Sequence, residues 1–338
     1  MSIPPFVSII VPCYNEETTI RHLLDSVLAQ TYPRAQMELI ISDGMSTDRT
    51  QDVIAIFQKE HVTLAVRVVE NSTRTIPSGL NQAIRESRGE IIVRLDAHSM
   101  PFPEYVEHCV AAHESNKGDN VGGVWEIRAG ADGWVAESIS FAAAHPLGVG
   151  DAMYRLNAKA GVVDTVPFGS FRRGLIDKIG LFDETLLSNE DYEFNTRVRE
   201  SGGKVWLDPS IRSIYFSRGT LEKLASQYWR YGFWKFKMLK RYPHTLRWRQ
   251  ALPPVFVLTL FILIVLSLFI GFARCILAAQ LLIYFSALGL AGLKLAIEKR
   301  NVFLLIGLPL AISTMHISWG TGFLWSSISS LFPADQHG

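Results

Sequence analysis

The sequence predicts an α/β domain with a mostly parallel sheet flanked by helices, followed by a membrane region. Short apolar segments alternate with segments of helical periodicity through residue 116, which is typical of a parallel sheet covered on both faces. The composition then changes after Gln250, where long apolar segments begin. With 338 residues and 48% hydrophobic content, the chain is long enough to hold both parts.

Four strand and helix pairs account for the first part of the chain. Strands are expected at residues 6–13, 37–42, 63–69 and 90–96. Helices are expected at residues 17–30, 47–60, 76–87 and 102–116. In the first helix, Ile20, Leu23, Leu24 and Val27 recur at the spacing of one buried face. Sheets of this kind bind ligands outside the carboxyl ends of their strands, so we expect the functional residues in those loops.

Polar side chains follow three of the expected strands. Glu16 comes after the first strand, Asp43 after the second, and Asp96 and His98 after the fourth. Neither a G-x-G-x-x-G nor a Walker pattern follows any of these strands, which argues against a dinucleotide site or a P-loop. We interpret the acidic strand ends as ligands for ribose hydroxyls and for a divalent cation that neutralises a diphosphate.

Three apolar segments predict membrane spans at about residues 255–273, 275–293 and 302–325, because a bilayer core takes roughly 20 helical residues. Basic residues precede the first span, and no acidic residue occurs between Lys223 and Ile297. Positive charge marks the cytoplasmic side, which places the first 250 residues in the cytoplasm and the C-terminus outside. The short link at Arg274 has an alternative interpretation, a helical hairpin that does not fully cross.

These patterns divide the chain into a cytoplasmic domain at residues 1–220, a basic and aromatic interfacial region at 221–250, and a membrane domain at 251–338. Basic and aromatic residues together also suit nucleic acid, but their position directly before a span favours the membrane surface. The first five residues lack the features of a secretory signal. The three cysteines have neither metal-type nor disulfide-type spacing.

The motifs resemble those of the family 2 glycosyltransferases, which have the GT-A fold. The matching strings, in family order, are VPCYNE at 11–16, DGMSTDRT at 43–50, GEIIVRLDAH at 89–98, FGSFRR at 168–173 and NED at 189–191. The run QYWRY at 227–231 resembles the Q-x-x-R-W element of membrane-bound members, with Tyr231 in place of tryptophan. The resemblance covers about residues 5–235 and implies an enzyme that transfers a sugar from a nucleoside diphosphate.

The resemblance also implies roles for donor-binding residues. Pro12, Tyr14 and Glu16 would line the nucleoside pocket of a UDP-sugar, and Asp43 would accept a hydrogen bond from the base or ribose. Asp96 and His98 match the D-x-D element that holds the ribose and a metal. Imidazole replaces the second carboxylate, and imidazole suits Mn²⁺ better than Mg²⁺, so Mn²⁺ is the expected preference.

The same comparison supplies the catalytic residues. Within the Glu190-Asp191 pair, Asp191 aligns with the general base of the family, and a single base implies one displacement with inversion at the anomeric carbon. Arg230, which follows Gln227, and Arg218 would contact the leaving diphosphate. The chain most resembles the glucosyltransferases of succinoglycan-type exopolysaccharide synthesis. That resemblance implies UDP-glucose as donor and a polyprenyl-diphosphate-linked saccharide as acceptor at the inner membrane.

Several of these residues also have a purely structural interpretation. Asp43 and Asp48 are suited to capping the second helix. Glu190 and Asp191 open an expected helix, where acidic residues are favoured by the helix dipole. His316 in the third span is as well suited to holding helices together as to contacting a lipid acceptor.

Three other functions compete with a distributive transferase. One is a processive polysaccharide synthase, and another is a transferase that loads a polyprenyl monophosphate. The third is a membrane scaffold that binds a nucleotide without turnover. The sugar depends on the shape of the pocket formed by residues 121–171, which sequence alone does not specify.

Overall fold

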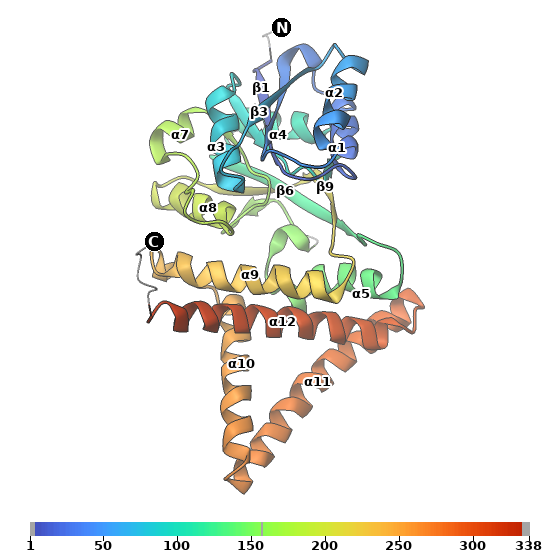
Figure 1. The fold of residues 1–338 in the computed structure, drawn as a ribbon, viewed down its shortest axis with the longest axis vertical. Helices are drawn as coiled ribbons and strands as arrows, with labels where there is room; N and C mark the ends of the chain where they lie inside the picture. Colours follow the sequence, from blue (N-terminus) through green and yellow to red (C-terminus); the bar gives the residue numbers. More distant parts are fainter. Residues whose placement is uncertain (1–3, 157, 333–338) are drawn as a thin grey trace. The chain divides into compact units, whose positions relative to one another are not determined.

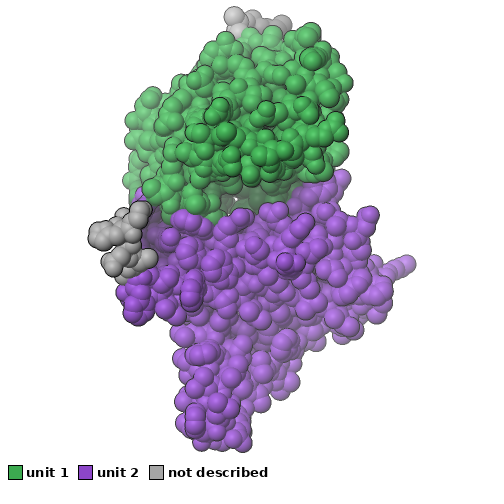
Figure 2. Space-filling view, viewed as in Figure 1, with its two compact units in different colours: residues 1–126, 153–215 green, residues 127–152, 216–338 purple. Residues whose placement is uncertain are grey.

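The computed structural model describes residues 4–156 and 158–332. The chain forms two compact units (Figure 2). The first contains residues 1–126 and 153–215, and the second contains residues 127–152 and 216–338. A segment from the middle of the chain therefore packs with the C-terminal helices, whereas the sequence analysis assigned residues 1–220 to one domain.

Half of the sheet in the first unit is parallel, as predicted. Its strands lie in the order β3-β2-β1-β4, and each neighbouring pair is parallel. They are β1 Val7–Cys13, β2 Met37–Asp43, β3 Ala65–Glu70 and β4 Ile91–Arg94. The helices between and after them are α1 Ile20–Leu28, α2 Thr50–Glu60, α3 Ile76–Glu86 and α4 Tyr105–Glu114. The carboxyl ends of β1 and β2 meet in register, Cys13 beside Asp43.

The other half of the sheet is formed by strands that the sequence analysis did not predict. β8 Ser170–Arg172 pairs antiparallel with β4 and with β6 Asn120–Arg128, while β5 Ser99–Pro101 and β7 Gly161–Val162 pair antiparallel with β9 Val205–Phe216. Two further helices belong to this half, α7 Gly174–Ile179 and α8 Glu190–Glu200. The predicted α/β fold with flanking helices is confirmed, and the sheet is mixed.

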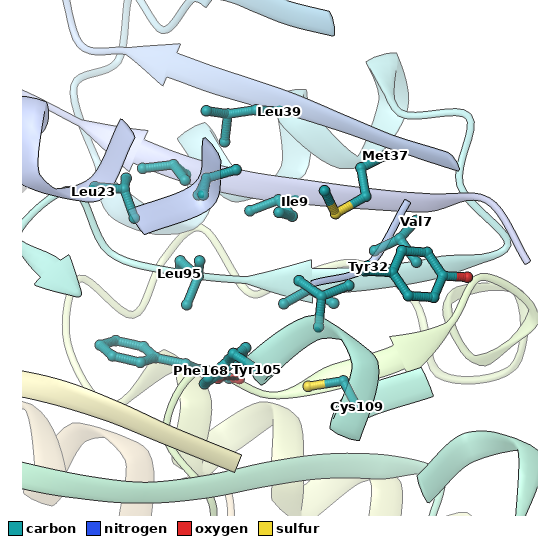
Figure 3. Close-up of a cluster of buried hydrophobic side chains, with 14 of the residues drawn as sticks. Val7, Ile9, Leu23, Tyr32, Met37, Leu39, Leu95, Tyr105, Cys109 and Phe168 are labelled. Carbon is teal, nitrogen blue, oxygen red and sulfur yellow. Dashed lines mark hydrogen bonds between the residues drawn. The ribbon is translucent and has the colours of Figure 1, made fainter. Parts of the chain in front are cut away.

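Each face of the sheet carries its own hydrophobic core. Successive side chains of a strand point to opposite faces, so Ile9 of β1 belongs to one core and Ile10 to the other. The first core joins β1 and β2 to α1, α2 and α4. Figure 3 shows part of it, with Leu23 of α1 and Cys109 of α4. The second joins the same strands to α3 and α8. Burial on both faces explains why β1 and β4 are almost continuous apolar segments rather than alternating ones, whereas β3, at the end of the strand order, has no buried residue.

One buried carboxylate secures the amino end of the parallel strands. The fully buried Glu38 on β2 accepts a hydrogen bond from Ser8 Oγ at 2.6 Å and from the Arg88 backbone N–H at 2.7 Å. The guanidinium of Arg67 lies 3.1 Å from Glu38 Oε2. Burial alone raises the pKa of Glu38, but these donors outweigh it, so the pKa is lowered.

The second unit is helical (Figure 1). Its helices are α5 Trp134–Ala143, α6 Pro146–Val149, α9 Leu221–Leu239, α10 Trp248–Ser267, α11 Gly271–Lys299 and α12 Leu304–Ser329. Short 3-10 turns lie in both units, at η1 Arg34–Gln36, η2 Met153–Arg155 and η3 Pro243–Thr245. By length and composition, α10, α11 and α12 are each able to cross a membrane. They differ in packing, because 39% of the most apolar window of α12 is buried, against 11% for α10 and for α11.

Candidate active site

The loop after β1 is held against the loop after β2 by an asparagine. Asn15 adopts a left-handed backbone conformation with φ of 54°. Its side-chain oxygen accepts a hydrogen bond from the Thr47 backbone N–H at 2.8 Å, and its own N–H donates to Ser46 Oγ at 2.9 Å. These bonds fix the neighbouring Tyr14, whose ring is 43% exposed and lies 5.9 Å from the Arg74 guanidinium.

Asp43, predicted to bind the nucleoside, is buried at the carboxyl end of β2. Its carboxylate accepts hydrogen bonds from Ser46 Oγ at 2.6 Å and from Gln51 Nε2 at 2.6 Å. Asp48 accepts a hydrogen bond from the backbone N–H of Thr50 at 3.0 Å, which is a local turn bond before α2, because the N-cap residue of α2 is Arg49 and it makes no side-chain capping bond. These two aspartates therefore organise the loop, and Asp43 keeps further lone pairs for a ligand because a carboxylate has about four acceptor sites.

Arg94, the last residue of β4, is the centre of the site. Its side chain is only 3% exposed. Its Nη2 lies 3.2 Å from Asp96 Oδ1 and 2.9 Å from Glu190 Oε1, and its Nη1 contacts Asp191 Oδ1. Three of the predicted site residues therefore converge on one guanidinium that the sequence analysis did not select.

Local structure explains how these residues converge. Asp96 lies two positions after Arg94, where side chains of an extended segment return to the same face. Glu190 and Asp191 form the first turn of α8, directly after Asn189, whose φ of 67° reverses the chain. Acidic residues are stabilised at a helix N-terminus, and here they also meet a buried cation.

The charges at the site do not balance. Burial acts to lower the pKa of Arg94, but the carboxylates of Asp96 and Glu190 outweigh it, so the pKa is raised and the guanidinium stays charged. Three carboxyl side chains around one guanidinium give the cluster a formal charge of minus two. Such an excess of negative charge favours the binding of a cation or of a positively charged transition state.

His98 contacts another predicted residue. Its Nδ1 lies 3.1 Å from Glu16 Oε1, while Thr19 Oγ1 donates a hydrogen bond to Glu16 Oε2. Glu16 in the loop after β1 and His98 in the loop after β4 are brought together because β1 and β4 are parallel neighbours. The loops after these strands thus form one edge of the sheet, as expected for ligand binding in this architecture.

The side chains at the site can supply some, but not all, of the ligands of a metal ion. Asp96 supplies oxygen and His98 supplies nitrogen, and both are accepted ligands of Mn²⁺. Among residues 4–156 and 158–332, however, no group of three His, Cys, Asp or Glu side chains is placed to hold a metal ion. The residues therefore fit a cation whose remaining ligands come from water and a bound diphosphate, the usual arrangement for ions that keep substrate oxygens in their shell.

The other predicted residues lie in the second unit. Gln227 is buried on α9, and its Nε2 donates to Tyr231 Oη at 3.0 Å. Arg230 is exposed on the same helix, and Arg218 is half-buried before it. His316 on α12 is held structurally, since its Nε2 donates to the Leu147 carbonyl at 2.8 Å and its Nδ1 lies 3.0 Å from Tyr284 Oη.

Sequence reasoning also missed an aromatic cluster in the first unit. Trp125 on β6 stacks on Tyr215 with ring centroids 4.2 Å apart, and Phe168 and Tyr154 pack around it. The Arg155 guanidinium lies 4.8 Å from the Trp125 ring. The cluster joins residues from the 121–171 region to the end of β9, and no periodicity in the sequence indicates this contact.

Comparison with characterised proteins gives a consistent result. The sequence pattern described as Glycosyl transferase family 2 matches residues 8–180. The chain is 28% identical over 325 residues to a Methanococcus voltae protein, the dolichyl N-acetyl-alpha-D-glucosaminyl phosphate 3-beta-D-2,3-diacetamido-2,3-dideoxy-beta-D-glucuronosyltransferase, with 94% of this chain and 96% of that protein covered. It is 25% identical over 319 residues to the succinoglycan biosynthesis protein ExoA of Rhizobium meliloti, with 93% of each chain covered.

Solved structures show the same fold. The mannosyltransferase PcManGT from Pyrobaculum calidifontis, in complex with GDP-Man and Mn²⁺, aligns with a TM-score of 0.63 and 19% identity, covering 99% of this chain and 89% of that chain. TarS residues 1–349 from S. aureus, in complex with UDP-GlcNAc, aligns with a TM-score of 0.51 and 17% identity, covering 96% and 92%. At these identities the likeness is one of architecture.

Proposed function

The chain belongs to glycosyl transferase family 2 and is a glycosyltransferase, and we propose that it transfers glucose from UDP-glucose, with inversion, to a polyprenyl-diphosphate-linked saccharide in exopolysaccharide biosynthesis. The observation that carries this proposal is the convergence of Asp96, Glu190 and Asp191 on the buried guanidinium of Arg94. This cluster connects the end of β4, which is predicted to bind the donor, to the start of α8, which is predicted to supply the general base.

Asp191 is the proposed general base. An Asp191 carboxylate oxygen takes the proton of the acceptor hydroxyl while that oxygen forms a bond to the anomeric carbon. The bond from the anomeric carbon to the β-phosphate oxygen breaks, its electron pair leaves with UDP, and the α-linked donor gives a β-linked product. Base catalysis of this kind contributes roughly 10²–10⁴-fold to a rate. Half-exposure of Asp191 is consistent with contact to an acceptor.

Glu190 and Arg94 position the base. Glu190 is nearly buried and bonds Arg94 Nη2, so it holds the guanidinium in the orientation that brings Nη1 to Asp191. Arg94 in turn tethers the first turn of α8 to the end of β4. A base has to stay within hydrogen-bond reach of the proton that it abstracts, and this pair of contacts restrains it.

Donor binding is assigned to the loops after β1, β2 and β4. We assign Tyr14 as a stacking surface for the nucleobase, Pro12 at the end of β1 as a further residue of the nucleoside pocket, and Asp43 as an acceptor for the nucleobase or ribose. A divalent cation held by Asp96 and His98, with Glu16 bonded to the imidazole, would neutralise charge on the departing diphosphate. Mn²⁺ is the proposed ion and Mg²⁺ the alternative. Arg218, Arg230 and Gln227 are proposed as further contacts of the donor and its diphosphate.

The names of two relatives support the acceptor assignment. The Methanococcus voltae relative is named for transfer to a sugar on dolichyl phosphate, and the Rhizobium meliloti relative for succinoglycan biosynthesis. A sugar hydroxyl has to lose a proton during attack, whereas the phosphate of a bare lipid carrier is already ionised. A retained base at Asp191 therefore favours a sugar acceptor over the monophosphate-loading alternative.

We propose that the protein is a multi-pass protein of the cytoplasmic membrane with its catalytic part, residues 1–220, in the cytoplasm. Apolar helices that suit a bilayer occur in the second unit, and basic residues precede α10. Residues 221–250 would form the interfacial region and residues 251–338 the membrane domain.

The direct test uses membranes that contain the full chain. They are incubated with radiolabelled UDP-glucose and a synthetic polyprenyl-diphosphate-linked sugar, and label is counted in the organic phase. We expect a β-linked product that membranes carrying the Asp191→Asn variant do not form. Label on polyprenyl monophosphate without a sugar acceptor would support the alternative reaction. Binding of UDP without transfer to either lipid would support the non-catalytic scaffold.

A further inference from the structure

Helix α9 is too polar to cross a bilayer. Exposed charged residues recur along its 19 residues, at Glu222, Lys223, Arg230 and Lys237. A charged side chain is costly within the hydrocarbon core of a bilayer, and the exposed Arg230 lies in the middle of α9. Basic and aromatic side chains on an amphipathic helix instead suit the boundary between headgroups and acyl chains.

Helix α12 packs along α9 at close range. A Cβ at Gly232 of α9 would lie 2.1 Å from the Trp319 carbonyl oxygen, and a Cβ at Gly322 of α12 would lie 2.1 Å from the Trp229 carbonyl oxygen. The rings of Phe236 and Phe323, one turn further along both helices, are 5.3 Å apart. From the Gly232–Trp319 contact to the Phe236–Phe323 contact both helices advance by four residues, so the helices are parallel, and Figure 1 shows them side by side.

The contact continues toward the start of both helices. One core cluster contains Leu224 and Tyr228 of α9 together with Leu308, Ala311, Ile312 and Met315 of α12. Two helices that pack over most of their length lie at the same depth in a membrane. The depth of α9 therefore determines the depth of α12.

We propose that α12 lies in the membrane interface beside α9, and that the hairpin of α10 and α11 alone enters the bilayer. The three-span arrangement expected from hydropathy is thereby reduced to two membrane-inserted helices. The segment that follows α12 then emerges on the same side as α9, whereas three crossings would put it on the opposite side. This inference concerns the lipid-facing surface and does not depend on which sugar is transferred.

The distribution of tryptophan supports this arrangement independently. Tryptophan concentrates at membrane interfaces and is disfavoured at depth. The tryptophans of the second unit are Trp134, Trp229, Trp234, Trp248, Trp319 and Trp325. They lie on α5, on α9, at the first residue of α10 and on α12, and the hairpin from Arg249 to Phe303 contains none. Trp319 lies in the middle of α12, where a spanning helix would be deepest.

The two ends of the hairpin, the start of α10 and the end of α11, contact the same segment of the second unit. At the start of α10, Arg249 forms an ion pair with Asp151. After the end of α11, Asn301 Nδ2 donates to Glu137 Oε2 at 2.9 Å. Glu137 and Asp151 both belong to residues 127–152, which pack on α12. The 20 residues of α10 reach about 30 Å, the thickness of a hydrocarbon core, and the apolar tip ends with Phe269 80% exposed.

Depth measurements along one face of α12 test the proposal. Ile306, Leu310, Ile317 and Ile328 are exposed and lie within a narrow arc of the helix. Each is replaced by a spin-labelled cysteine in the full chain carrying Cys275→Ser, since Cys13 and Cys109 are buried. The protein is reconstituted in vesicles of phosphatidylethanolamine and phosphatidylglycerol, and oxygen accessibility relative to a water-soluble nickel complex reports depth.

We expect one shallow depth at all four positions of α12. Labels at Leu252, Leu258, Ile262 and Leu266 of α10 serve as the internal control and should become deeper along the helix. A spanning α12 would move its labels through about 33 Å and make Ile317 the deepest, which would overturn the proposal. Reporter proteins fused to the C-terminus give a second test. The proposal requires that a fluorescent cytoplasmic reporter is active there and that alkaline phosphatase is inactive. Active phosphatase would contradict it.

Discussion

Arg94 Nη2 and Glu190 Oε1 lie 2.9 Å apart, which joins the last residue of β4 to the first residue of α8. The two residues are 96 positions apart in the chain. The same guanidinium contacts Asp96 and Asp191, so a single side chain connects the proposed donor and base residues. The properties of this cluster lead to the first two predictions.

Replacing Arg94 by methionine should abolish transfer and destabilise the first unit. The substitution leaves three carboxylates close together without a cation, and breaking a buried ion pair costs about 3–5 kcal/mol. Arg94→Lys keeps the charge but not the planar fork, so it should recover stability better than activity. Thermal unfolding in detergent and the lipid-transfer assay measure the two effects. Arg172→Met, at an exposed pair with Glu90, is the matched control and should change neither. Normal transfer by Arg94→Met would refute the positioning role.

Asp96→Ala and Asp191→Asn should separate binding from transfer. Loss of Asp96 removes a proposed metal ligand and should abolish Mn²⁺-dependent binding of UDP. Loss of Asp191 removes only the proposed base, so UDP should still bind while transfer falls by roughly 10²–10⁴-fold. Calorimetric titration with UDP and Mn²⁺ measures binding in both variants. Equal loss of affinity in the two would argue against this division of roles.

The metal preference should depend on His98. Imidazole favours Mn²⁺-type ions, whereas carboxylate suits Mg²⁺ as well. The ratio of activity with Mn²⁺ to activity with Mg²⁺ should therefore fall in His98→Asp, measured after chelation and re-addition of each ion. His108→Asp is the control, because His108 lies on α4 and contacts the Ser210 carbonyl on β9, away from the proposed metal ligands. An unchanged ratio in His98→Asp would show that His98 is not a metal ligand. Full activity under strong chelation would show that transfer does not need a metal.

Particular residues show how far sequence reasoning reaches. β1 is predictable because it is a short, nearly continuous apolar segment, and α1 because its apolar residues recur at the spacing of one helix face. β8 is three residues long and pairs with β4 from nearly 80 positions away, so no local pattern identifies it. Arg94 did carry a signal: it is a lone charge in a buried strand, two positions before Asp96. Buried charges require partners, and that rule would have selected it.

The membrane region shows a different limit. Hydropathy identified three segments of sufficient length, and the structure has three helices there. Hydropathy does not report which surface an apolar residue packs against, so lipid and α9 are equivalent partners for α12 in such a pattern. Gly232 and Gly322 were the available indication, because small residues permit close approach of helices.

Gly232→Ala should therefore loosen α9 from α12. An added Cβ would lie 2.1 Å from the Trp319 carbonyl oxygen, so the helices have to separate, and overpacking of this kind costs about 1–3 kcal/mol. Gly289→Ala on α11 is the matched control, because no neighbouring atom lies within 4 Å of its added Cβ. That control should be neutral or slightly stabilising, since alanine is the better helix former. Unfolding in detergent compares the two, and equal stability would mean that the helices are not closely packed.

His113 should make the first unit sensitive to acid. It is buried, and its ring Nε2 donates to Ser170 Oγ at 3.1 Å, which in turn donates to the Val121 carbonyl. Burial lowers the pKa of His113 from 6.5 to about 4 in the folded protein. Between pH 6.5 and about 4 the unfolded chain binds a proton that the folded chain does not, so stability falls as the pH falls through this window.

The loss attributable to His113 approaches about 3 kcal/mol at the acid end, at 1.36 kcal/mol per pKa unit. His113→Gln keeps a polar group that cannot take up a proton, so its stability should fall less steeply between pH 6.5 and 4. Denaturant unfolding of the full chain at a series of pH values measures the slope. His22→Gln is the control, because His22 is exposed on α1 and its replacement should leave the slope unchanged. If His113→Gln and the parent chain lose stability in parallel, the acid sensitivity originates in carboxylates such as Glu38, whose lowered pKa acts in the same direction at lower pH.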